Sequence, residues 1–231
     1  MFSNLIAVQG LSGADVAEPV DRLVDVGGYR LHFQIIPGQG IPILFESGGG
    51  DDATVWKDLL KPVAAVTGST VIAYDRAGFG KSEMDPSQHG IMNDVKGLEI
   101  GLAKLGYSGE IMIVAHSLGG FYATLYSARH PQQVGAVVLL DANLICFFAD
   151  EHLRKMQDSE AQLARYKEQG IGRYYSALDF ASNIEVLRKT GFPGRPRRSQ
   201  RCCWRWSFQA PRVAELLPPV SARISKCLAF G

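Results

Sequence analysis

The sequence lacks the features that mark several classes of protein. No apolar run approaches the roughly 20 residues that a membrane-spanning helix requires. Residues 1–19 carry no positively charged segment, so we interpret them as an exposed leader and not as a signal peptide. The four cysteines have neither zinc-ligand spacing nor the density of a disulfide-rich domain. These absences favour a cytoplasmic protein with no metal, no cofactor and no membrane partner.

Histidine is also scarce, and none of the five follows residue 152. We expect His32 and His89 in solvated positions, and His116 in a packing role. His130 follows a helical pattern, where its charge would suit the end of the helix dipole. His152 lies in a helical segment and could approach the site, but we do not favour it as the catalytic base.

The last segment of the chain, residues 194–231, differs in composition from the rest. It holds eight Lys or Arg and one acidic residue, a charge of +7, whereas the preceding 193 residues carry −6. Three interpretations stay open: an aberrant segment from a frameshifted coding region, an arginine–tryptophan arm for nucleic acid or anionic surfaces, and a disordered tail without a role. We prefer the first, and expect no nucleic-acid partner.

Short apolar runs alternate with helical periodicity from residue 41 to residue 141, after a hairpin pattern around Gly27 and Gly28. Apolar strands that alternate with helices are typical of a mostly parallel sheet covered on both faces. The sequence therefore predicts a doubly wound α/β domain over residues 20–148. Residues 149–193 follow it, and within them residues 149–190 have the pattern of two or three helices with polar faces.

The stretch "IMIVAHSLGG" at 111–120 places a serine between an apolar strand and an apolar helix. A nucleophile on such a tight turn needs a strained backbone and small neighbours, which Ala115, Gly119 and Gly120 provide. The alternative interpretation of Ser117 is a simple helix N-cap. The context favours a nucleophile.

Three motifs together make the chain resemble the α/β-hydrolase fold family over roughly residues 20–193. The family's nucleophile elbow, G-x-S-x-G, is here "AHSLG", with alanine in the first place. Its oxyanion loop is similar to "SGGGDDATVW", in which Ser47 stands where the family usually has histidine, Gly49 is the amide donor, and Trp56 follows nine residues after Ser47. Its D-R-x-G-x-G-x-S loop matches "DRAGFGKS", Asp75 to Ser82.

The resemblance implies a role for each of these residues. Ser117 would be the nucleophile, the backbone amides of Gly49 and Leu118 would bind the oxyanion, and residues 149–193 would form a helical lid. Asp141, which ends the sixth strand pattern, is the best remaining candidate for the catalytic acid. We expect Asp75–Arg76 to be a structural ion pair that ties loops together.

The resemblance also shows what this sequence does not contain. The family places its catalytic histidine after the eighth strand, but residues 194–231 contain neither a convincing strand nor a histidine. The last two strands of the fold are therefore apparently missing.

The favoured function is a serine hydrolase that acts on a carboxylic ester or related small acyl substrate, impaired by the absence of the base. A serine nucleophile argues against dehalogenases, which use an aspartate there. The alternative is a non-catalytic binding protein on the same fold. A nucleic-acid binder rests on the basic tail alone.

Overall fold

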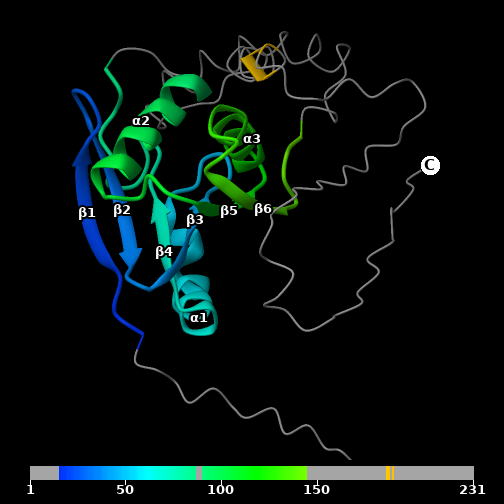
Figure 1. Cartoon of the computed structure of the whole chain (residues 1–231). Coiled ribbons are helices and arrows are strands. Elements are labelled where there is room, and N and C mark those ends of the chain that lie inside the picture. Colours follow the sequence, from blue (N-terminus) through cyan, green and yellow to red (C-terminus); the bar gives the residue numbers. More distant parts are fainter. Residues whose placement is uncertain (1–15, 87–89, 145–185, 188, 190–231) are drawn as a thin grey trace, which may run out of the picture.

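The computed structural model describes residues 16–86, 90–144, 186–187 and 189, and these form a sheet with helices on both faces (Figure 1). The strands are β1 (Val20–Asp25), β2 (Arg30–Ile36), β3 (Gly40–Glu46), β4 (Ser69–Tyr74), β5 (Ile111–His116) and β6 (Val134–Leu140). The helices are the short 3₁₀ helix η1 (Ala53–Trp56), α1 (Lys57–Thr67), α2 (Ile91–Lys104) and α3 (Gly119–Arg129).

The six strands lie in the order β1-β2-β4-β3-β5-β6. β2 is antiparallel to both β1 and β4, whereas β4, β3, β5 and β6 run parallel. From β3 the chain moves to β4 on one side and later returns to β5 on the other. The direction of winding therefore reverses beside the carboxyl end of β3, which is where open α/β sheets bind their ligands.

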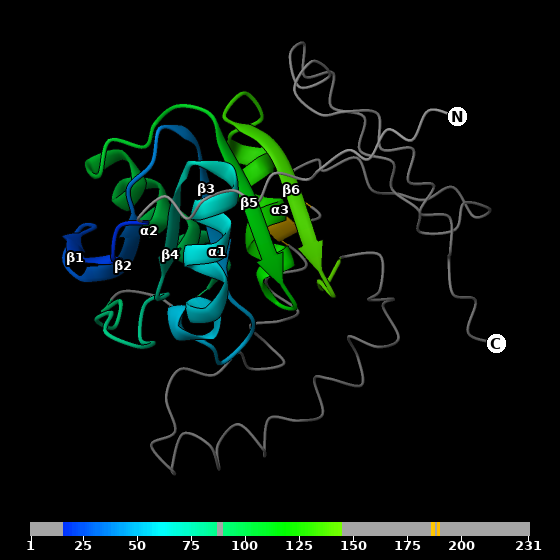
Figure 2. The same cartoon turned by 90° about the horizontal axis from the view of Figure 1, so that it is seen from below.

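Helices cover the two faces of the sheet unequally. α2 and α3 lie on one face and α1 lies on the other (Figures 1 and 2). Side chains alternate accordingly: Leu44 and Ile72 join the core beneath α2 and α3, whereas Phe45 and Ala73 join the core beneath α1. This confirms the predicted doubly wound, mostly parallel α/β sheet, and the predicted hairpin is β1 and β2.

Several predictions fall on residues whose structure is not described. The tail at 194–231, the question of two missing strands, and most of the predicted lid at 149–193 lie outside the described residues. From the lid segment, Leu187 is completely buried in the core beneath α2 and α3. Among the described helices, none has the length and apolar character that crossing a membrane requires.

Candidate active site

Ser117 occupies the turn between β5 and α3 and has a φ of +48°, in the left-handed region that residues with a side chain rarely adopt. Its N–H donates to the carbonyl of Leu140 at 3.2 Å. Its carbonyl accepts from the N–H groups of Gly120 at 3.0 Å and Asn143 at 2.7 Å. Contacts from β6 and the segment after it thus hold the serine in a strained conformation, as expected for a nucleophile on a tight turn.

The small residues after Ser117 are needed because two other backbone segments pass close by. A Cβ on Gly119 would lie 2.6 Å from the carbonyl oxygen of Glu46 and 2.8 Å from that of Ser47. A Cβ on Gly120 would lie 2.6 Å from the carbonyl oxygen of Asn143. Each distance is too short for a real contact, so the turn fits between β3 and the chain after β6 only with glycine at both positions.

The loop after β3 lies directly against the residue after the serine. A Cβ on Gly49 would be 3.2 Å from Leu118 Cδ2 and 3.6 Å from Leu118 Cβ. The structure therefore brings together Gly49 and Leu118, the two residues predicted to supply oxyanion amides. Both flank Ser117 at the carboxyl ends of β3 and β5, beside the point where the winding reverses.

The nine-residue spacing from Ser47 to Trp56 has a direct structural cause. Trp56 Nε1 donates a hydrogen bond of 2.9 Å to Ser47 Oγ, which in turn donates to the Asp52 carbonyl at 3.1 Å. Asp52 also caps η1, since its side chain accepts from the N–H of Thr54 at 2.8 Å. These bonds fold residues 47–56 back on themselves and close the loop that contains Gly49.

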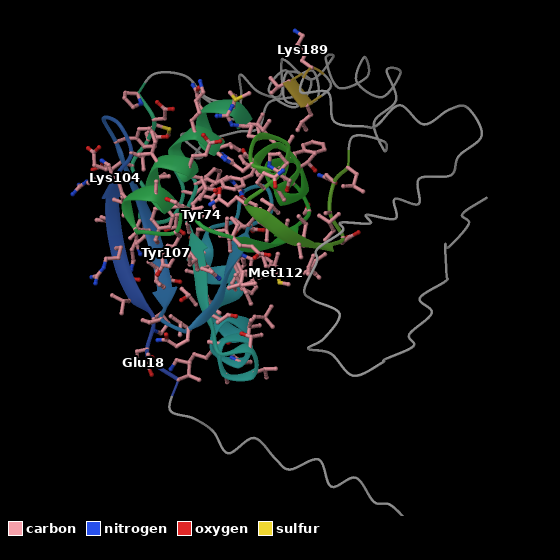
Figure 3. The ribbon with its side chains drawn as sticks, in the orientation of Figure 1. Glu18, Tyr74, Lys104, Tyr107, Met112 and Lys189 are labelled. Carbon is pink, nitrogen blue, oxygen red and sulfur yellow. The ribbon has the colours of Figure 1, made fainter. Side chains whose placement is uncertain are left out.

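A buried ion pair lies beneath this loop. Arg76 Nη1 lies 2.6 Å from Glu46 Oε1, and the two side chains are 1% and 2% exposed. Tyr74, at the centre of the molecule in Figure 3, donates its hydroxyl to Glu46 Oε2 at 2.6 Å. Burial raises the pKa of the Glu46 carboxyl above its usual value, although Arg76 and the Tyr74 hydroxyl act in the opposite direction.

Sequence reasoning missed the role of Glu46 and expected Asp75–Arg76 to act as one ion pair. Asp75 and Arg76 do tie loops together, but through separate contacts: Arg76 binds Glu46, whereas Asp75 binds His32. Asp75 also accepts from the N–H of Ala53 at 2.7 Å and of Lys81 at 2.9 Å. The sequence does contain a signal for this ion pair, because Glu46 is an acidic residue at the end of the otherwise apolar strand β3.

The expectation that His32 is solvated is wrong. His32 is 2% exposed, and its Nδ1 lies 2.7 Å from Asp75 Oδ2. The loop after β4 covers this part of the hairpin: Ser82 Oγ accepts from the His32 N–H at 2.8 Å, and Asp75 donates its N–H to the His32 carbonyl. This histidine joins the hairpin to the loop after β4.

Among the described residues, no histidine side chain hydrogen-bonds to Ser117. His116 packs edge-on against Trp56, with 6.4 Å between ring centroids, which agrees with the packing role expected for it. His130 is the C-cap of α3, as predicted, and its Nε2 lies 2.9 Å from Glu99. His89 and His152 lie outside the described residues.

Asp141 directly follows β6 and is the other described non-glycine residue with a positive φ, +45°. It is exposed. Within the described parts of the chain, its carboxylate makes no hydrogen bond or ion pair. The structure places Asp141 at the same edge of the sheet as Ser117, but shows no contact that couples the two. Nor do the described residues contain a cluster of His, Cys, Asp and Glu that could hold a metal ion.

Comparison with known proteins gives a consistent family. The model of the alpha/beta hydrolase fold matches residues 41–171, more than half of the chain. Over 128 residues the chain is 34% identical to an uncharacterized protein of Mycobacterium tuberculosis, a match that covers 55% of this chain and 36% of that one. Over 138 residues it is 28% identical to a 2-hydroxy-6-oxo-6-(2'-aminophenyl)hexa-2,4-dienoic acid hydrolase of Metapseudomonas resinovorans, covering 58% and 47%.

Solved structures agree with this similarity. An alpha/beta hydrolase from Novosphingobium aromaticivorans matches with a TM-score of 0.53 and 28% identity, over 62% of this chain and 50% of that one. An epoxide hydrolase from Vigna radiata matches with a TM-score of 0.50 and 26% identity, over 55% and 39%. The chain spans between about a third and three fifths of the length of the first curated relatives it matches, from 36% to 57%.

Proposed function

The chain belongs to the alpha/beta hydrolase fold family, and from that premise we propose that it is a serine hydrolase of carboxylic esters or related small acyl compounds, with Ser117 as its nucleophile. One observation supports this above the others. Ser117 is held at a φ of +48° between β5 and α3, with Gly49 packed against Leu118 beside it. We also propose the cytoplasm as its compartment, because the four cysteines do not have the density of a disulfide-rich secreted domain.

In the proposed reaction, Ser117 Oγ attacks the acyl carbonyl carbon and the carbonyl oxygen becomes an oxyanion. The amides of Gly49 and Leu118 would donate to that oxyanion, and each such donor typically contributes about 3 kcal/mol to stabilising the transition state. Collapse of the tetrahedral intermediate expels the alcohol and leaves an acyl-serine, which water hydrolyses. Leu118 also lies at the start of α3, where the helix dipole favours negative charge.

The proton of the Ser117 hydroxyl needs an acceptor, because a neutral serine is a weak nucleophile. Within the described residues, no histidine side chain hydrogen-bonds to Ser117. The proposal therefore assigns the nucleophile and the oxyanion donors, names Asp141 as the candidate acid, and leaves the base unassigned. Asp141 is supported by its place at the carboxyl end of β6, next to the strand that precedes Ser117.

The experiment is active-site labelling with a fluorophosphonate probe. The Ser117 Oγ–P bond forms as the P–F bond breaks, fluoride leaves and the hydroxyl proton passes to solvent. We expect slow labelling of the wild type at Ser117, located by peptide mass spectrometry, and none in Ser117→Ala. Ser127→Ala is the matched control, because this serine is on α3 and its hydroxyl donates to the Ala123 carbonyl.

Equal labelling of the wild type and Ser117→Ala would contradict the assignment. So would a folded wild type that is not labelled at all. In that case the alternative is a non-catalytic binding protein on this fold, and a ligand that raises the thermal midpoint without being hydrolysed would support it.

A further inference from the structure

The charged side chain of Arg76 binds the loop of Gly49 from beneath. Its Nη1 donates to the carbonyl of Ser47 at 2.6 Å, and its Nη2 donates to the carbonyl of Gly48. The same Nη1 binds Glu46 Oε1 at 2.6 Å. One guanidinium therefore binds three consecutive residues, the last residue of β3 and the first two of the loop.

The contact with Gly48 fixes more than the position of one oxygen. The carbonyl of Gly48 and the N–H of Gly49 belong to the same peptide unit, which is planar, and in a trans peptide these two groups point in opposite directions. Holding the Gly48 oxygen toward Arg76 therefore turns the Gly49 N–H away from Arg76. Because the loop "SGGG" contains three successive glycines, its backbone has little intrinsic preference for that orientation.

We propose that Arg76 is a positioning residue, which fixes the direction of the Gly49 amide and so assembles half of the oxyanion hole. The inference rests on the proposed function, because it gives the Gly49 amide its purpose. Arg76 does not touch the substrate. It acts through the Gly48–Gly49 peptide, from the side of the loop opposite to the reacting atoms.

The residues around Arg76 hold its guanidinium rigidly, as a side chain that positions a loop requires. Its guanidinium lies 4.8 Å from the ring centroid of Tyr122 and 5.7 Å from that of Phe79, so aromatic faces restrict its plane. Glu46 neutralises the charge, which allows the side chain to be buried at 1% exposure. A lysine could supply the charge but not a planar fork of donors, and so could not bind the Glu46 carboxylate and both carbonyls in this geometry.

The test is Arg76→Lys, measured by the rate of fluorophosphonate labelling at Ser117. We expect the maximal labelling rate to fall by about 10- to 100-fold, somewhat less than the loss of a whole oxyanion donor. The probe concentration for half-maximal rate should change by less than about twofold, because probe binding itself is not altered.

Two control variants separate positioning from stability. Arg30→Lys makes the same substitution at a surface arginine that binds Glu83, and its labelling should equal that of the wild type. Gly101→Ala places a methyl 2.5 Å from Phe33 Cζ, in the core beneath α2, and should lower stability without changing the labelling rate. An Arg76→Lys variant that labels like the wild type would overturn the inference. A labelling loss in Gly101→Ala as large as in Arg76→Lys would also overturn it.

A second measurement does not depend on reactivity. In protein labelled with ¹⁵N-glycine, Arg76→Lys should shift the Gly49 amide resonance and accelerate its hydrogen exchange, while Gly101→Ala should not. A wild type without labelling at Ser117 would remove the proposed function, and the Gly49 resonance would still report whether Arg76 holds the loop. An unchanged Gly49 resonance in Arg76→Lys would overturn the positioning role whatever the labelling shows.

Discussion

Replacing Gly119 with alanine should damage both the stability of the domain and the geometry of the site. The added methyl would lie 2.6 Å from the Glu46 carbonyl oxygen and 2.8 Å from the Ser47 carbonyl oxygen. Both obstacles are backbone atoms, which cannot move aside by changing rotamer. Overpacking of this kind costs about 1–3 kcal/mol, and backbone obstacles place Gly119→Ala in the upper part of that range, at about 2–3 kcal/mol.

Urea unfolding gives the free energy directly, with Gly109→Ala as the matched control. Gly109 has open space around its would-be Cβ, so alanine there should change stability by less than about 1 kcal/mol, in the stabilising direction. Because the obstructing carbonyls immediately precede Gly48, Gly119→Ala should also slow fluorophosphonate labelling of Ser117. A Gly119→Ala variant as stable as Gly109→Ala, with normal labelling, would refute the account of how the turn packs against β3.

Three further substitutions test separate parts of the structure by urea unfolding. Ser117→Gly should be about 1 kcal/mol more stable than Ser117→Ala, because glycine adopts a φ of +48° without strain, and equal stability would argue against a strained turn. Trp56→Phe should cost about 1 kcal/mol through the lost hydrogen bond to Ser47, and no loss would contradict its structural role. Burial favours the protonated form of Glu99, but hydrogen bonds from Arg129 and His130 outweigh it and hold its pKa below the usual 4.5. The stabilisation is therefore fully present above about pH 4.5 and is lost as the pH falls through the lowered pKa. Glu99→Gln should cost at most about 1 kcal/mol at neutral pH and progressively less in acid, and an undiminished cost in acid would contradict this.

The central strands of the fold could be predicted from local patterns, because β2, β3, β4 and β5 each bury most of their own apolar run. β4 is buried at every position, and its sequence "STVIAY" correspondingly contains no charged residue. The strained turn at Ser117 was also predictable, since the small residues around the serine can be seen in one short stretch of sequence. Its partners Gly49 and Leu118 came from the resemblance to a family, and the structure shows them in contact.

Contacts between distant segments could not be predicted in the same way. His32 is buried and not exposed to solvent because the loop of Asp75, some forty residues later in the sequence, covers one face of the hairpin. The pairing of Glu46 with Arg76 likewise depends on β3 and β4 being neighbours in the sheet. Asp75 and Arg76 are adjacent in sequence, which suggested an ion pair between them. Adjacent residues after a strand point to different sides, so each of these side chains pairs with a different residue.

The burial of Glu46 and Arg76 also constrains how this sequence can change over evolution. Removing one member of a buried ion pair leaves an uncompensated charge and typically costs about 3–5 kcal/mol, a large part of the stability of an ordinary domain. A joint exchange for two apolar residues avoids that penalty, but it also removes the donors that Arg76 supplies to the carbonyls of Ser47 and Gly48. Among descendants of a common ancestor that keep the oxyanion loop, Glu46 and Arg76 should be retained together, and lineages that carry only one of the two charges should be rare.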